Sequence, residues 1–100
     1  MIELSTQELE IVKNICVPYK DRFDILVFGS RYTGNTHDHS DLDLAIKGSN
    51  PVDILLMAEL KDAFEASDLP FRADIVDFHR MSPEFQKIVL KNSTSLWKVS

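Results

Sequence analysis

A chain of 100 residues with 44% hydrophobic and 27% charged residues is typical of one soluble folded domain, which we expect over residues 1–100. The net charge of −5 argues against stable binding to nucleic acid, because that binding depends on cations that neutralise phosphates. The longest apolar run, residues 54–58, is too short to span a membrane, the N-terminus lacks a secretory signal pattern, and the single Cys16 excludes an internal disulfide. We therefore expect a cytoplasmic protein without membrane contact.

The first half of the chain contains four predicted elements: a helix over about 5–16, a strand over 24–28, a polar loop over 31–40 that opens with a helical turn, and a strand over 41–46. Ser5 and Glu8 form a capping-box pattern, and apolar residues then recur at helical spacing. The second segment is a continuous apolar run, which indicates a buried strand. The fourth alternates strictly, so it should have one apolar face and one acidic face.

The second half contains four more: a helix that begins at Asn50 and Pro51, a strand over 71–77, a helix that begins at Ser82-Pro83-Glu84, and a short terminal strand over 96–99. Asn50 is the expected N-cap of the first of these helices. The residues expected on the buried faces of the two helices are Val52, Leu56, Leu60, Ala63 and Phe64, then Met81, Phe85, Ile88 and Val89. The order of elements predicts a small α/β (α+β) domain with helices flanking a sheet.

Three aspartates are predicted to share one face of this sheet. Asp41 and Asp43 are two residues apart on a strand, so their side chains project from the same face, roughly 6–7 Å apart at the backbone. Asp74 lies on a later strand whose neighbouring positions are apolar. Asp77 falls on the opposite face of that strand, where we expect a surface or capping residue.

A cation among these carboxylates would relieve their mutual repulsion. Oxygen ligands suit Mg²⁺ or Mn²⁺, and two such ions can stabilise the attacking and leaving oxygens of a phosphoryl displacement. The turn at Gly29-Ser30 follows the first strand directly. Glycine lets a phosphate approach the backbone closely, and the amide and hydroxyl of Ser30 can donate to phosphate oxygens. Together these features predict chemistry on a nucleotide.

Gly29-Ser30, ten intervening residues and then Asp41-Leu42-Asp43 form the GSx10DxD signature of the polymerase-beta-like nucleotidyltransferase superfamily. The order of elements, with a third aspartate on a later strand, resembles its minimal nucleotidyltransferase (MNT) domain family. The stretches VFGSR, SDLDLAI and RADIVD match that family's pattern, so the resemblance covers nearly the whole chain. It implies the polymerase-beta-like nucleotidyltransferase fold, with a small mixed sheet flanked by helices.

The resemblance also implies a Mg²⁺-dependent transfer of AMP from ATP, with pyrophosphate as the leaving group. Carried over by position, Asp41 and Asp43 would bind both metal ions, and Asp74 would bind the catalytic ion and help deprotonate the acceptor hydroxyl. Catalytic and metal-binding roles thus fall on the same three residues.

Nucleotide binding would fall on Gly29 and Ser30, which would hold the triphosphate, and on Arg31. Thr33 stands where the family often has a second basic residue, so Arg31 would have to neutralise the triphosphate tail.

Minimal members of this family often pair with a small HEPN protein. The resemblance therefore implies a hetero-oligomer in which this chain, as antitoxin, adds AMP to a tyrosine of a HEPN ribonuclease toxin. One alternative is an aminoglycoside-type nucleotidyltransferase that modifies a small molecule. Another is a non-enzymatic antitoxin that acts by binding, against which the intact aspartates argue.

Four further residue types have competing interpretations. His37 and His39 lack a third soft ligand nearby, so solvation or contact with substrate is favoured over a zinc site. Arg72 shares the predicted face of Asp74 and either contacts the nucleotide or pairs with a carboxylate. Trp97 is expected in the core or a partner interface, and Cys16 as a small buried hydrophobe.

Overall fold

The computed structural model describes residues 2–34 and 40–99. Its elements are α1 (Thr6–Cys16), β1 (Asp24–Phe28), α2 (Ser30–Thr33), β2 (Leu42–Lys47), α3 (Ile54–Glu65), β3 (Ala73–Asp77), α4 (Pro83–Lys91) and β4 (Thr94–Ser95), with 3-10 turns at Val17–Tyr19, Phe78–Arg80 and Leu96–Lys98. This order matches the predicted order of helices and strands. Within the described ranges, no helix is both long and apolar enough to cross a membrane.

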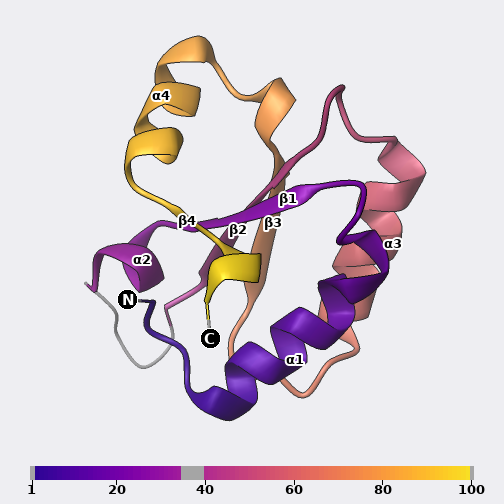
Figure 1. The fold of residues 1–100 in the computed structure, drawn as a ribbon. Helices are drawn as coiled ribbons and strands as arrows, with labels where there is room; N and C mark the ends of the chain where they lie inside the picture. The colour runs from indigo at the N-terminus through magenta and orange to yellow at the C-terminus, as the bar shows by residue number, and fades with distance from the viewer. Residues whose placement is uncertain (1, 35–39, 100) are drawn as a thin grey trace.

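The strands form one mixed sheet in the order β3-β2-β1-β4 (Figure 1). β1 pairs antiparallel with β2 and with β4, whereas β2 and β3 run parallel. The parallel pair is possible because α3 provides the crossover connection that such a pair needs. The predicted fold class, a small mixed sheet flanked by helices, is confirmed.

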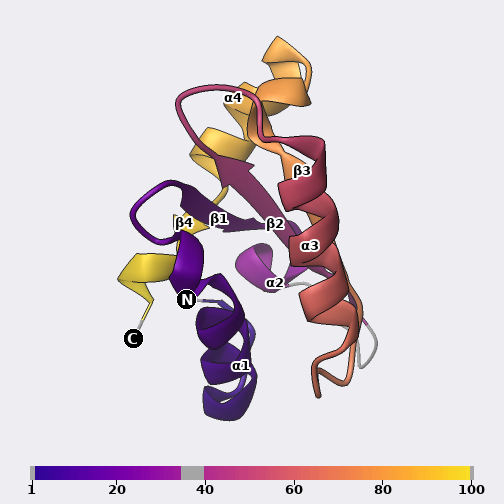
Figure 2. The same ribbon diagram turned by 90° about the vertical axis from the view of Figure 1, so that its right-hand side faces the viewer.

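The two faces of the sheet are covered unequally. Alternate residues of β1, β2 and β3 pack against α1 and α3 in the main core, which includes Ile25, Val27, Leu42, Leu44, Ile46 and Ile75. The other face carries a small cluster of Leu26, Ala45, Phe78 and Val89, where α4 packs. Figures 1 and 2 show α1 and α3 side by side and α4 at the opposite end of the molecule. The second face is therefore only partly covered.

Two helix starts follow the sequence closely. Ser5 caps α1, accepting a hydrogen bond from the Glu8 amide while the Glu8 carboxylate accepts one from the Ser5 amide, which confirms the capping box. Ser82 caps α4 by accepting a hydrogen bond from the amide of Phe85, with Pro83 in the first turn. Cys16 is buried in the core, and burial raises the pKa of its thiol to about 12.

The predicted start of α3 at Asn50-Pro51 is wrong. The helix begins at Ile54, and Asp53 is its N-cap, accepting a hydrogen bond from the Leu55 amide. The preceding residues stay extended because the amide of Val52 donates to the Asp77 carboxylate at 2.7 Å. Most of the predicted buried face is confirmed, since Val52, Leu60 and Phe64 are buried, but Met57 is buried as well and Ala63 is exposed.

The terminal strand also differs from its prediction. Residues 94–95 pair with Leu26 and Val27 of β1, and Leu96–Lys98 form a 3-10 turn rather than a strand. Leu96 is fully buried, and Trp97 packs against the main core as expected. In α4, Val89 is buried, but Phe85 and Ile88 are not, although both were expected on the buried face.

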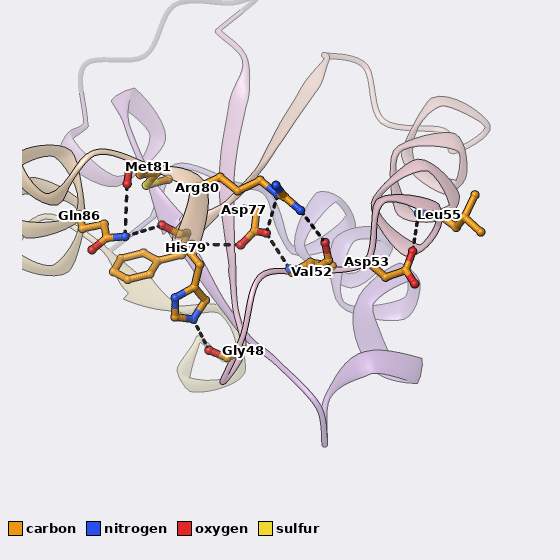
Figure 3. A network of polar contacts seen from close by, with 10 residues as sticks. Gly48, Val52, Asp53, Leu55, Asp77, His79, Arg80, Met81 and Gln86 are labelled. Atoms are coloured by element: carbon orange, nitrogen blue, oxygen red, sulfur yellow. Dashed lines mark hydrogen bonds and ion pairs between the residues drawn. The ribbon is translucent and has the colours of Figure 1, made fainter.

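Asp77, the last residue of β3, contacts several neighbouring segments (Figure 3). The residue is 5% exposed, and its carboxylate accepts hydrogen bonds from the amides of Val52 and His79, at 2.7 and 3.0 Å. Arg80 pairs with it at 3.3 Å. The ring of His79 in turn donates to the carbonyl of Gly48 at 2.5 Å. Asp77 is thus a capping residue, as predicted, but it is buried and not on the surface.

Replacing Asp77 with Ala should lower the free energy of unfolding by about 2–4 kcal/mol, because each buried donor left without an acceptor costs about 1–3 kcal/mol. Urea-induced unfolding would measure this loss. Asp68→Ala, at an exposed position, is the matched control and should change stability by less than about 0.5 kcal/mol. Equal stability of the two variants would contradict the structural role of Asp77.

Candidate functional site

The DxD pair and the third aspartate lie on the partly covered face. Asp43 is in β2 between Leu42 and Leu44, which point into the main core, so its side chain points to the other face. The parallel register pairs Asp43 with Asp74 of β3. Asp41 immediately precedes β2, two residues from Asp43. The sheet therefore brings all three predicted residues to one face, at the end where β2 and β3 begin.

Gly29 lies against this cluster. Its φ of +75° belongs to the region that favours glycine, and a Cβ at this position would lie 2.1 Å from Oδ2 of Asp43. Any larger side chain would therefore displace the Asp43 carboxylate. The glycine of the GS motif lets the turn after β1 approach the carboxylate of the DxD motif closely.

The carboxylates influence one another electrostatically. Burial raises the pKa of the half-buried Asp43 carboxyl above its usual value, and the negative charges of Asp74 and Asp41 raise it further. Asp41 and Asp74 are exposed. Within the described part of the chain no Lys or Arg forms an ion pair with any of the three, since the ion pair there joins Arg80 to Asp77 on the opposite face. Among the described residues, no ion pair offsets their repulsion.

The donor chemistry fits a divalent cation, because all three side chains offer hard carboxylate oxygens and their repulsion favours a positive charge. The site is not preassembled, however. Among residues 2–34 and 40–99, no three carboxylate, imidazole or thiolate side chains lie close enough together to form a metal-binding cluster. The backbone thus places the three predicted ligands on one face, but their side chains do not lie close enough together to bind one metal ion.

Ser30 begins α2 directly after Gly29, so the predicted helical turn at this point is confirmed. The carbonyl of Gly29 accepts hydrogen bonds from the amides of Tyr32 and Thr33, both at 3.0 Å. Ser30 is half-buried, and the amide of Gly34 closes the turn on its carbonyl at 2.9 Å. The GS turn is therefore held in place by its own backbone.

Arg31 is buried and makes several contacts within the protein. It is 7% exposed, and its guanidinium donates to the carbonyls of Glu3 and Ser40, at 2.7 and 2.9 Å. It also lies over the ring of Phe71, 3.7 Å from the ring centre. Because these contacts occupy the guanidinium, the structure does not support the expectation that Arg31 neutralises a triphosphate. Instead, Arg31 fixes the segment before Asp41 against the segment before β3.

Arg72 remains available near the carboxylates. Its carbonyl accepts a hydrogen bond from the Leu42 amide at 2.9 Å, which places its backbone beside the start of β2. Its side chain is exposed and, with Lys61 and Asp74, lines a hollow of about 480 Å³ between α3 and β3. Of its two predicted roles, ion pairing with a carboxylate is not seen among the described residues. His37 and His39 lie outside the described residues.

Sequence reasoning missed the aromatic border of the site. Phe28 pairs in register with Asp43, and its ring meets that of Phe85 of α4 edge to face, with ring centres 6.0 Å apart. The alternation of β1 already placed Phe28 on the same face as Leu26, away from the main core. The contact of Phe85 with Phe28 depends on the position of α4 in the fold, which the local sequence does not indicate.

Replacing Asp43 with Asn should raise the melting temperature at pH 7 in metal-free buffer by about 1–4 °C. A raised pKa in the folded state means that Asp43 contributes stability below its unfolded pKa and loses it as pH rises through the folded pKa. One kcal/mol corresponds to roughly 4–8 °C in a domain of this size, and solvent screening reduces the effect to a fraction of that.

The difference in melting temperature between Asp43→Asn and the wild type should vanish near about pH 3, where the Asp43 carboxyl is protonated in both the folded and the unfolded state. Thermal unfolding with and without Mg²⁺ would test this, with Asp68→Asn as a control that should show no pH-dependent gain. A variant less stable than the wild type at pH 7 would show that the Asp43 carboxylate makes favourable contacts instead.

The chain is similar to known proteins in sequence and in fold. The family model for polymerase beta nucleotidyltransferases matches residues 10–100. "Probable protein adenylyltransferase MntA" of Haemophilus influenzae is 40% identical over 90 residues, which cover 90% of this chain and 79% of that protein.

Two solved structures are also similar. A toxin–antitoxin complex with AMP-PNP contains a chain that is 25% identical, with a TM-score of 0.72 over 92% of this chain and 74% of that one. A minimal nucleotidyltransferase is 30% identical, with a TM-score of 0.69 over 88% of both chains. The resemblance drawn from the GSx10DxD motif is confirmed, and the chain belongs to the polymerase beta nucleotidyltransferase family.

Proposed function

We propose that this nucleotidyltransferase is an antitoxin that transfers AMP from ATP to a hydroxyl, most simply that of a tyrosine, on a companion HEPN ribonuclease toxin in the cytoplasm. The observation that carries the proposal is the placement of Asp41, Asp43 and Asp74 on one open face of the sheet. The 40% identity to MntA, a protein named as a protein adenylyltransferase, supports a protein acceptor. The likeness to a chain of a toxin–antitoxin complex with AMP-PNP supports both the partner and the nucleotide.

The carboxylates would hold the divalent metal, Mg²⁺ or Mn²⁺, that family membership implies. When bound, two such ions supply charge stabilisation to the attacking and leaving oxygens of the displacement. Asp41 and Asp43 are proposed as ligands of both ions, and Asp74 as a ligand of the catalytic ion. Gly29 and Ser30 are proposed to receive the triphosphate, with Arg72 in place of Arg31 as the accessible cation.

The transfer itself needs one bond formed and one broken. The acceptor oxygen bonds to the α-phosphorus of ATP while the bond from that phosphorus to the pyrophosphate oxygen breaks. The hydroxyl proton passes to the Asp74 carboxylate, which is exposed and can be approached by a hydroxyl group. Products are the adenylylated hydroxyl and pyrophosphate.

An acceptor on a protein suits this site better than a free small molecule. The hollow that includes Asp74 has walls from α3 and β3 alone, whereas small-molecule sites usually enclose most of their ligand. A protein acceptor brings its own walls when it docks. AMP attached beside a ribonuclease centre would then add a bulky anion, which blocks the centre by charge and size.

Co-expression of this chain with its HEPN companion, followed by intact-mass analysis, tests the proposal. We expect a mass gain of one or more AMP units on the companion, and none with Asp41→Ala. An unmodified companion that is inhibited within a tight complex would instead favour neutralisation by binding. Transfer of AMP to an aminoglycoside, with no protein modified, would favour the small-molecule alternative.

Replacing Asp74 with Asn should lower the rate of AMP transfer at least ~10²-fold, because the amide cannot accept the proton. The fold should be retained, since Asp74 is exposed. Single-turnover AMP transfer at saturating ATP is the measurement, and Asp68→Asn, at an exposed position outside the sheet, should retain the wild-type rate. A loss of less than tenfold in Asp74→Asn would remove Asp74 from the proposed base role.

A further inference from the structure

One flank of α4 exposes apolar side chains beside the carboxylates. Phe85 is 41% exposed and Ile88 is 55% exposed. They are three residues apart on the helix, so they lie on the same side of it. Val89, the next residue, is buried against the sheet and fixes the orientation of the helix. We call Phe28, Phe85 and Ile88 the apolar wall.

The apolar wall begins directly beside the DxD motif. Phe28 and Asp43 are paired residues of the antiparallel strands β1 and β2, so their Cβ atoms are about 4.5–5.5 Å apart on one face. Phe85 packs edge to face on Phe28 at 6.0 Å. From there α4 continues toward Thr94, which pairs with Val27 next to Phe28. The apolar wall therefore follows the edge of the sheet face that carries the three aspartates.

The opposite flank of α4 is turned away from this face. Gln86 reaches back from that flank to the carbonyls of Phe78 and Met81, at 3.0 and 3.3 Å (Figure 3). Leu90 lies four residues beyond Gln86 and so on the same side. At 100° per residue, it is about 200° around the helix from Ile88. It has the same exposure as Ile88, 55%.

We propose, resting on the proposed function, that the apolar wall is the surface on which the acceptor protein docks. An acceptor hydroxyl can reach Asp74 only if the surface around it covers this face of the sheet, and the wall lies on that face. A second copy of this chain seated on the wall would block access to the carboxylates.

The chemistry of the wall sets what the partner must present. Exposed aromatic and aliphatic side chains grouped at one place are typical of the buried centre of protein interfaces. The partner should therefore carry an apolar patch beside its acceptor hydroxyl. The charged residues Glu84, Lys87 and Lys91 of α4 would form the rim, where contacts contribute little to affinity.

Ile88→Glu and Leu90→Glu form a matched pair of variants, because both place the same charge at equally exposed positions of one helix. Isothermal titration calorimetry would measure the affinity of each full-length variant for the unmodified HEPN companion, and separately for AMP-PNP with Mg²⁺. We expect Ile88→Glu to weaken the complex at least tenfold and Leu90→Glu less than twofold. Affinity for AMP-PNP should be unchanged in both.

Equal affinity of the two variants for the companion would overturn the docking proposal while leaving the proposed AMP transfer intact. Weaker AMP-PNP binding by Ile88→Glu would assign the apolar wall to the nucleotide and would also overturn the docking proposal. A wild-type dimer that Ile88→Glu dissociates, measured by light scattering, would assign the wall to a second copy. If the companion is never modified but still distinguishes the two variants, the docking proposal stands and the proposed activity falls.

Discussion

The parallel pairing of β2 with β3 is the interaction on which the placement of Asp43 and Asp74 depends, with Asp41 next to the start of β2. The pKa of Asp43 is raised, and the two neighbouring carboxylates contribute to that rise after burial. Such a cluster persists only if the surrounding backbone holds it. The parallel pairing of β2 with β3 does so by aligning Asp43 with Asp74, and the main core on the far side of the sheet fixes both strands.

The cation next to the GS motif has a structural role. Arg31 follows the GS motif directly, yet its guanidinium holds the carbonyls of Glu3 and Ser40 and stacks on Phe71. Ser40 precedes Asp41, and Phe71 lies two residues before β3. Arg31 thus anchors the segments that carry the carboxylates, and among the described residues it forms no ion pair with them. In the part of the chain that the structure describes, therefore, no ion pair compensates the charge of the three aspartates.

Much of this could be predicted from local sequence. The alternation at 41–46 placed Asp43 on the correct face, and the residues Ser5 and Ser82 marked two helix starts. The wrong predictions concern positions where contacts with residues distant in the sequence determine the structure. Asn50-Pro51 has the pattern of a helix start, but the Asp77 carboxylate takes the Val52 amide, and the cap moves to Asp53. The burial of Arg31 likewise depends on three separate segments that no local pattern connects.

The short length of α4 leaves the face of the sheet that carries the three aspartates open. The helix is nine residues long and buries Val89 alone against the sheet, so it covers the Leu26 and Ala45 positions and stops beside Phe28. A longer or more deeply seated helix would bury Phe28 fully and close over Asp43. The same short helix that completes the second, smaller core therefore leaves Asp43 and Asp74 accessible and leaves Phe85 and Ile88 exposed beside them. Openness of the site and exposure of its apolar border have one structural cause, and a docked protein would relieve both.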